Sequence, residues 1–230
     1  MSILRQTDNY EMNGKAILAP SEPHRACVLL LDTSGSMSGA SIASMNKAIR
    51  VFKEQISLDE LAQKCVDIAI IEFNDTARVV QEFIPLLQLQ PVSLSAVGNS
   101  AMGEGINVAI DKIKERSAFY NSIGTPFYIP WIIMISRGTP TDDISIARQR
   151  VIDEASKGSH GKLKFWAIGV SGYNQETLSS FTKHCIAIDD FINILDGFSF
   201  PNVIISPKTS VGEKPDFPEL SGDWPIPEDW

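Results

Sequence analysis

A carboxylate and the first two serine hydroxyls after it fall at every second position in the stretch from Cys27 to Gly39, which reads C-V-L-L-L-D-T-S-G-S-M-S-G. They are Asp32, Ser34 and Ser36. One carboxylate with two hydroxyls offers only oxygen donors, and these suit a small hard cation such as Mg²⁺, which keeps waters or an outside ligand in its remaining positions. The spacing therefore predicts a site for a divalent metal, with Mn²⁺ or Ca²⁺ as substitutes for Mg²⁺.

The residues before Asp32 are expected to form a strand that is buried on both faces. Cys27 to Leu31 are all apolar, without the polar alternation of a half-exposed strand. Gly35 and Gly39 follow in the loop, where glycine permits turns that other residues resist. Asp32 would thus lie at the carboxyl end of a parallel strand, which is where open α/β sheets bind their ligands.

The D-x-S-x-S pattern resembles the metal-ion-dependent adhesion site (MIDAS) of von Willebrand factor type A (VWA) domains, which integrin inserted domains share. In that family a glycine-and-threonine loop supplies a further hydroxyl, and G-N-S-A-M-G-E-G resembles this loop with Ser100 as the hydroxyl residue. The resemblance implies that Asp32, Ser34, Ser36 and Ser100 hold one ion, whose open position takes an aspartate or glutamate of a partner protein. The residues alone favour a simpler role for Ser100, the N-cap of the next helix.

Alternating strands and helices are expected to position these side chains. Apolar runs predict strands at 27–31, 66–74, 77–83, 127–136, 163–170 and 186–188, and a three-to-four spacing of apolar residues predicts helices between them. Only two or three residues separate 66–74 from 77–83, so this pair must be an antiparallel hairpin. The predicted fold is a doubly wound, mostly parallel α/β sheet with helices on both faces and one antiparallel edge strand.

The chain is expected to hold one VWA domain, over residues 25–200. Residues 1–24 contain Pro20 and Pro23 and are predicted to be an irregular N-terminal arm. Residues 201–230 are rich in proline and are predicted to be an extended tail that packs on its own domain.

Composition excludes several classes of protein. A net charge of −8 argues against a nucleic-acid-binding surface, which needs clustered Lys and Arg. No apolar run is long enough to span a bilayer, and the first residues lack the apolar core of a secretory signal, so a cytoplasmic protein without a membrane partner is expected. Cys27, Cys65 and Cys185 are widely spaced in apolar surroundings and are predicted to be buried free thiols.

A closer resemblance concerns the second half of the chain. The I-G-V turn after Trp166, the D-D-F helix and the V-x-x-S-P-K-T-S-V-G-E tail resemble bacterial TerY-type VWA proteins. This resemblance implies a cytosolic protein of a tellurite-resistance or stress system, with a kinase or a phosphatase of the same system as its partner.

One position departs from the family pattern. The fourth main strand of the family ends in I-S-D-G or T-D-G, whose aspartate supports the metal, whereas this chain has I-S-R-G with Arg137 at that place. A monocation about 5 Å from a divalent ion, at an effective dielectric constant of about 20, costs on the order of 6 kcal/mol. We expect a weakened metal site if Arg137 swings into solvent, or a metal-free scaffold if it pairs with Asp32. Asp142 and Asp143 are expected to cap the next helix and not to bind metal.

An enzyme is the less favoured hypothesis. An aspartate after a buried strand is similar to the nucleophile of haloacid-dehalogenase-type phosphatases, but these need an acid two positions later, where this chain has Ser34. No phosphate-binding G-x-x-x-x-G-K-[ST] loop is present. His24, His160 and His184 are expected at the surface, which leaves no catalytic triad. We therefore expect a binding protein and no catalytic residue.

Overall fold

Six strands form one sheet, in the order β5-β4-β3-β6-β7-β8. The computed structural model describes residues 9–12, 15–56, 60–157 and 162–197. The strands are β3 (Arg25–Asp32), β4 (Val66–Phe73), β5 (Ala77–Pro85), β6 (Trp131–Ser136), β7 (Lys164–Gly169) and β8 (Cys185–Ala187). Every neighbouring pair is parallel except β4 and β5, and β5 forms the edge. The predicted α/β fold with one antiparallel edge strand is confirmed.

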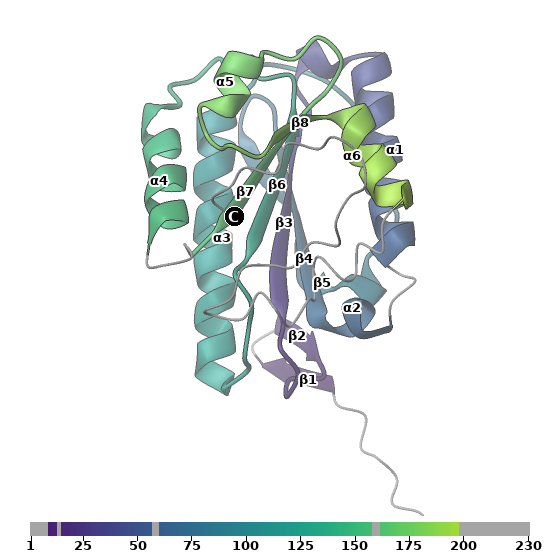
Figure 1. Ribbon diagram of the computed structural model, residues 1–230, viewed down its shortest axis with the longest axis vertical. Coiled ribbons are helices and arrows are strands. Elements are labelled where there is room, and N and C mark those ends of the chain that lie inside the picture. The colour runs from purple at the N-terminus through teal and green to yellow at the C-terminus, as the bar shows by residue number, and fades with distance from the viewer. Residues whose placement is uncertain (1–8, 13–14, 57–59, 158–161, 198–230) are drawn as a thin grey trace, which may run out of the picture.

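Helices cover both faces of this sheet (Figure 1). One face carries α1 (Ala40–Ile56), which packs against α6 (Ile188–Gly197), and the other carries α3 (Met102–Ile123) and α4 (Ser145–Ser156). Short elements complete the fold: α2 (Glu60–Cys65), α5 (Gln175–Ser179) and the 3-10 turns η1 (Gly35–Met37) and η2 (Leu86–Gln88). No helix among the described residues is long and apolar enough to cross a membrane.

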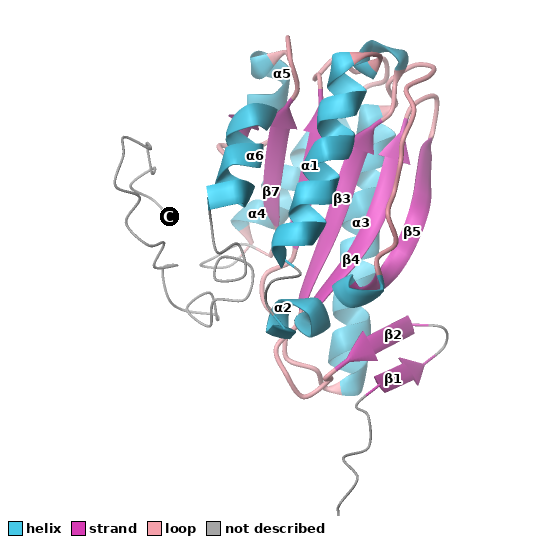
Figure 2. Ribbon diagram, turned by 90° about the vertical axis from the view of Figure 1, so that its right-hand side faces the viewer, coloured by secondary structure: helices cyan, strands magenta, loops and turns pink. Residues whose placement is uncertain are grey.

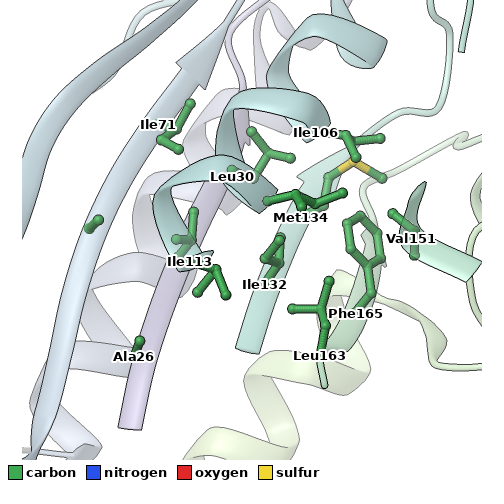
Figure 3. Packing of buried hydrophobic residues seen from close by; sticks show 14 of the residues in the cluster. Ala26, Leu30, Ile71, Ile106, Ile113, Ile132, Met134, Val151, Leu163 and Phe165 are labelled. Carbon is green, nitrogen blue, oxygen red and sulfur yellow. The ribbon is translucent and has the colours of Figure 1, made fainter. Parts of the chain in front are cut away.

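Side chains of the central strand β3 belong to two separate hydrophobic cores, one on each face of the sheet. Cys27, Leu29 and Leu31 face the α1 side, whereas Ala26 and Leu30 face the α3 side. Figure 3 shows the second core, where Leu30 and its neighbours pack under α3. Because successive strand residues point to opposite faces, burial on both faces requires an unbroken apolar run. This explains why the sequence before Asp32 does not alternate.

The N-terminal region differs from the prediction. Residues 9–18, expected to be part of an irregular arm, contain an antiparallel hairpin of β1 (Asn9–Met12) and β2 (Lys15–Leu18). The hairpin lies at the end of the sheet opposite the α5 end (Figure 2), and Ile17 is buried in the core on the α3 side. The four-residue strands were too short to give a clear alternation. Residues 1–8 and the tail 201–230 lie outside the described part of the chain.

The three cysteines form no disulfide, and two of them are buried as predicted. Cys27 lies on β3 and Cys65 at the end of α2, whereas Cys185 on β8 is only half-buried. Burial raises the pKa of the Cys27 thiol to about 12, so it remains protonated.

Candidate metal site

Asp32 is the last residue of β3 and is completely buried. Its Oδ1 accepts a hydrogen bond from the Ser34 backbone N–H (2.9 Å), and its Oδ2 accepts one from the Ser136 hydroxyl (2.6 Å). Ser136 ends the neighbouring strand β6, and its hydroxyl also accepts from the Gly138 N–H. Within the described residues the Asp32 carboxylate forms no ion pair, although burial of an unpaired charge is costly. The carboxylate is therefore oriented by two hydrogen bonds, and no Lys, Arg or His side chain of the described residues neutralises it.

The Ser34 and Ser36 hydroxyls lie close to each other in the loop after Asp32. The Oγ atoms of Ser34 and Ser36 lie 2.9 Å apart, and the Oγ1 of Thr139 lies 3.4 Å from that of Ser36. Ser34 is buried and Ser36 half-buried. Thr139 was missed by the sequence analysis, because its place near Ser36 depends on how the loop after β6 folds back over the loop after β3.

A third loop brings Ser100 to the same end of the sheet. The Gly35 N–H donates to the Gly98 carbonyl (2.8 Å), and the Ser100 and Thr141 backbones are also joined, through the Thr141 N–H and the Ser100 carbonyl (2.9 Å). Ser100 is 2% exposed, and its Oγ has no hydrogen-bond partner among the described residues. The loops that carry Asp32, Ser34, Ser36 and Ser100, four residues called the oxygen cluster below, are thus joined by backbone hydrogen bonds at one end of the sheet.

The N-cap role of Ser100 is not what the structure shows. The residue at the N-cap of α3 is Ala101, which makes no side-chain cap. Instead Asp142, from the loop after β6, accepts from the Gly103 and Glu104 N–H groups (3.1 and 3.0 Å). The prediction that Asp142 caps the helix after it was therefore wrong, because Asp142 caps α3. Asp143 does cap that helix, since its Oδ1 accepts from the Ser145 N–H (2.8 Å).

Arg137 adopts neither of the two expected positions. Its Nη1 donates to the Ser36 carbonyl (3.0 Å), and a Cβ added at Gly172 would lie 3.0 Å from its Nη2. The guanidinium is thus half-buried between the loops after β3 and β7, and neither free in solvent nor paired with Asp32. The alternative of a metal-free scaffold required an ion pair between Arg137 and Asp32. That pair does not form among the described residues, so this alternative is wrong.

The oxygen cluster fits a divalent cation by its chemistry. It combines a buried carboxylate that forms no ion pair with a buried hydroxyl that has no hydrogen-bond partner, both judged among the described residues. In the described ranges no three His, Cys, Asp or Glu side chains come together as a metal site, so an ion here would depend on hydroxyl ligands. Hydroxyl and carboxylate oxygens favour Mg²⁺, Mn²⁺ or Ca²⁺ over softer ions.

The two histidines that the structure describes, His24 and His184, precede β3 and β8 and so lie at the amino ends of the strands. His24, expected at the surface, is completely buried, with Nδ1 3.1 Å from Asp67 Oδ2. Tyr120 also donates to this carboxylate, and burial raises the pKa of Tyr120 so that it keeps its proton. This cluster lies at the amino ends of the strands, far from Asp32. His184 is half-buried, again contrary to expectation, and His160 lies outside the described residues.

Comparison with known proteins agrees with the fold. A family model described as von Willebrand factor type A domain matches residues 27–196. The vWF domain of the type V pili tip protein Mfa5 from Porphyromonas gingivalis is 13% identical with a TM-score of 0.58, over 85% of this chain and 99% of that one. Proximal thread matrix protein 1 from the mussel byssus is 15% identical with a TM-score of 0.57, over 78% of this chain and 46% of that one.

A further structure of the byssus protein has zinc in its MIDAS motif; it is 14% identical with a TM-score of 0.51, over 78% of this chain and 46% of that one. At such identities the likeness shows the fold alone. The chain spans about half the length of the byssus protein. No match was found among the curated proteins.

Proposed function

Because this chain belongs to the von Willebrand factor type A domain family, we propose that it is a protein-binding module built on a divalent-metal site of the MIDAS type. One observation carries the proposal: Asp32 is fully buried, has no cation partner among the described residues, and lies beside hydroxyls that are hydrogen-bonded mainly to one another. A buried carboxylate in this state is stabilised by a cation. An aspartate or glutamate of the partner protein is the expected outside ligand.

Each member of the oxygen cluster has a distinct role in this proposal. Asp32 supplies the negative charge, and its orientation is fixed by the Ser34 N–H and the Ser136 hydroxyl. Ser34, Ser36 and Ser100 supply neutral oxygens. The ion, when bound, offers an open coordination position to the partner's carboxylate. Arg137 adds a positive charge next to Ser36 and weakens occupancy, so metal and partner bind best together.

We also propose that the module has no catalytic activity. Both Asp32 oxygens are engaged by hydrogen bonds, and the position two residues later carries a hydroxyl in place of the general acid that an aspartyl-phosphate mechanism needs. Hydrolysis of a generic phosphate ester, if seen at all, should be the same for the native chain and for Asp32→Asn. Loss of a measurable rate in Asp32→Asn would revive the enzyme hypothesis.

The finer setting of the module is proposed from the sequence. The D-D-F helix and the S-P-K-T-S-V-G-E segment support a cytoplasmic protein of a TerY-type tellurite-resistance or stress system. A kinase or a phosphatase of the same system is the proposed partner. Co-purification of the tagged chain with such a protein, dependent on Asp32, would support this assignment.

Titration calorimetry with Mg²⁺ and Mn²⁺ tests the metal site. Arg137→Asp restores the second carboxylate, so we expect it to bind Mg²⁺ at least about a hundredfold more tightly than the native chain. Arg50→Asp on the exposed side of α1 makes the same change of charge away from the site and should leave metal binding unchanged. Equal, tight binding by the native chain and Arg137→Asp would contradict the role given to Arg137, and no binding by either would contradict the metal site.

A further inference from the structure

The charge around the oxygen cluster differs from that of a site with two aspartates. There, two carboxylates neutralise a divalent ion before any partner arrives. Here Asp32 provides one negative charge, and the Arg137 guanidinium at the Ser36 carbonyl adds a positive one. With an ion bound, about two positive charges remain uncompensated, and one carboxylate from a partner removes only one of them.

From this we propose that the site selects a dianionic group, a phosphorylated serine or threonine of the partner protein, over an aspartate or glutamate. The inference rests on the proposed metal site and changes only its preferred ligand. A phosphate monoester carries about −1.5 to −2 charges at neutral pH and has three acceptor oxygens. It can therefore match both the ion and the guanidinium, with one oxygen for the metal and others for Arg137.

The position of Arg137 supports a role in binding phosphate oxygens. Only its Nη1 has a hydrogen-bond acceptor, the Ser36 carbonyl at 3.0 Å, and its Nε is buried with no partner among the described residues. No carboxylate of the described chain pairs with it. The space for the guanidinium is left by Gly172, which has no side chain and a φ of +71°. A cation held at a site without an acidic partner is available for an anion that comes from outside.

Peptide binding at saturating Mg²⁺ tests the selection. The probes are capped peptides Gly-Gly-X-Gly-Gly, with phosphoserine, aspartate or serine at X, titrated into the ¹⁵N-labelled chain and followed by amide chemical shifts. We expect the phosphoserine peptide to bind about tenfold or more tightly than the aspartate peptide, and the serine peptide not to bind. We expect Arg137→Lys, which keeps the charge, to retain most of this preference, and Arg137→Asp to lose it.

Control variants separate the inference from the proposed function. Arg50→Asp should keep the native preference for phosphoserine, because it changes the same charge away from the site. If Arg137→Asp binds Mg²⁺ but the native chain binds the aspartate peptide as tightly as the phosphoserine peptide, the inference is overturned and the metal site stands. If neither protein binds Mg²⁺, both are overturned. Phosphoserine preference that survives in Arg137→Asp would overturn the role of the guanidinium.

Discussion

Asp32 and Ser100 are polar groups that the folded chain buries without using their full hydrogen-bonding or ionic capacity. Most buried polar groups in proteins are satisfied, since an unmet one costs about 1–3 kcal/mol. Features that cost stability are often retained at functional sites, where ligand binding can offset the cost. Asp32 and Ser100 lie at the same end of the sheet, as expected when a ligand completes a site, whereas Asp67 Oδ1 and Arg116 Nε, which are also buried without a partner among the described residues, lie at the opposite end.

Replacing the Ser100 hydroxyl tests this argument at a single atom. We expect Ser100→Ala to keep or raise the free energy of unfolding of the metal-free protein, by up to about 1 kcal/mol, because it removes a buried group without a partner. The matched control is Thr125→Val, since the buried Thr125 hydroxyl does donate, to the Pro20 carbonyl at 2.9 Å. The control should lose about 1 kcal/mol.

Urea unfolding with and without Mg²⁺ measures both effects. Stabilisation by Mg²⁺ should be smaller for Ser100→Ala than for the native chain, and unchanged for Thr125→Val. Equal losses of stability in the two variants, with equal responses to Mg²⁺, would mean that Ser100 has an ordinary structural role.

Among the elements, the strands of the main sheet and the helices that cover it were predictable, whereas the N-terminal hairpin and the loop contacts were not. The unbroken apolar run of β3 and the short connection between β4 and β5 follow directly from the sequence. The cap of α3 does not, because Asp142 reaches it from a loop about forty residues later in the chain. The contact of Arg137 with Ser36 depends in the same way on how two loops meet. A site that several loops share is only partly encoded in any one of them.

The β7–β8 edge should carry a pH dependence. The His184 ring stacks on Trp166 (4.9 Å between centroids), and burial, with Lys164 and Lys183 nearby, lowers the pKa of His184 from 6.5 to about 4. The unfolded chain therefore takes up a proton near pH 6.5 that the folded chain refuses until about pH 4. The contribution of His184 to the free energy of unfolding is complete above pH 6.5. It decreases by about 2 kcal/mol as the pH drops to 4, a figure reduced to allow for the partial exposure of the ring.

Replacing His184 by glutamine removes the titrating ring. In His184→Gln the free energy of unfolding, measured in urea between pH 4 and 7, should fall less steeply with decreasing pH than in the native chain. Stability at pH 7 is expected to drop as well, because the stacking on Trp166 is lost. The same slope in both proteins would show that His184 is not responsible for the pH dependence.

Across the whole molecule, the two ends of the sheet carry different polar clusters. The carboxyl ends of the strands carry the oxygen cluster. The amino ends carry a buried charge cluster, where Asp67 Oδ2 lies 2.8 Å from Arg116 Nη2 and accepts from Tyr120. Arg116 also donates to the Ala16 carbonyl of β2 and so ties the N-terminal hairpin to the domain. Strand register pairs Ala26 with Asp67 and Asp32 with Phe73, which separates the two clusters by about 20 Å.

This separation predicts that stability and metal binding can be changed independently. Asp67→Asn leaves the Arg116 charge buried without its counter-ion and should lower the free energy of unfolding by about 3 kcal/mol or more. Asp111→Asn is the control, since it removes an exposed carboxylate whose pair with Arg150 contributes little. Both substitutions are made in the Arg137→Asp protein. As long as they are folded, the two double variants should bind Mg²⁺ with the same affinity as Arg137→Asp alone. A loss of Mg²⁺ affinity in Asp67→Asn, measured below its unfolding transition, would show that the two ends are energetically coupled.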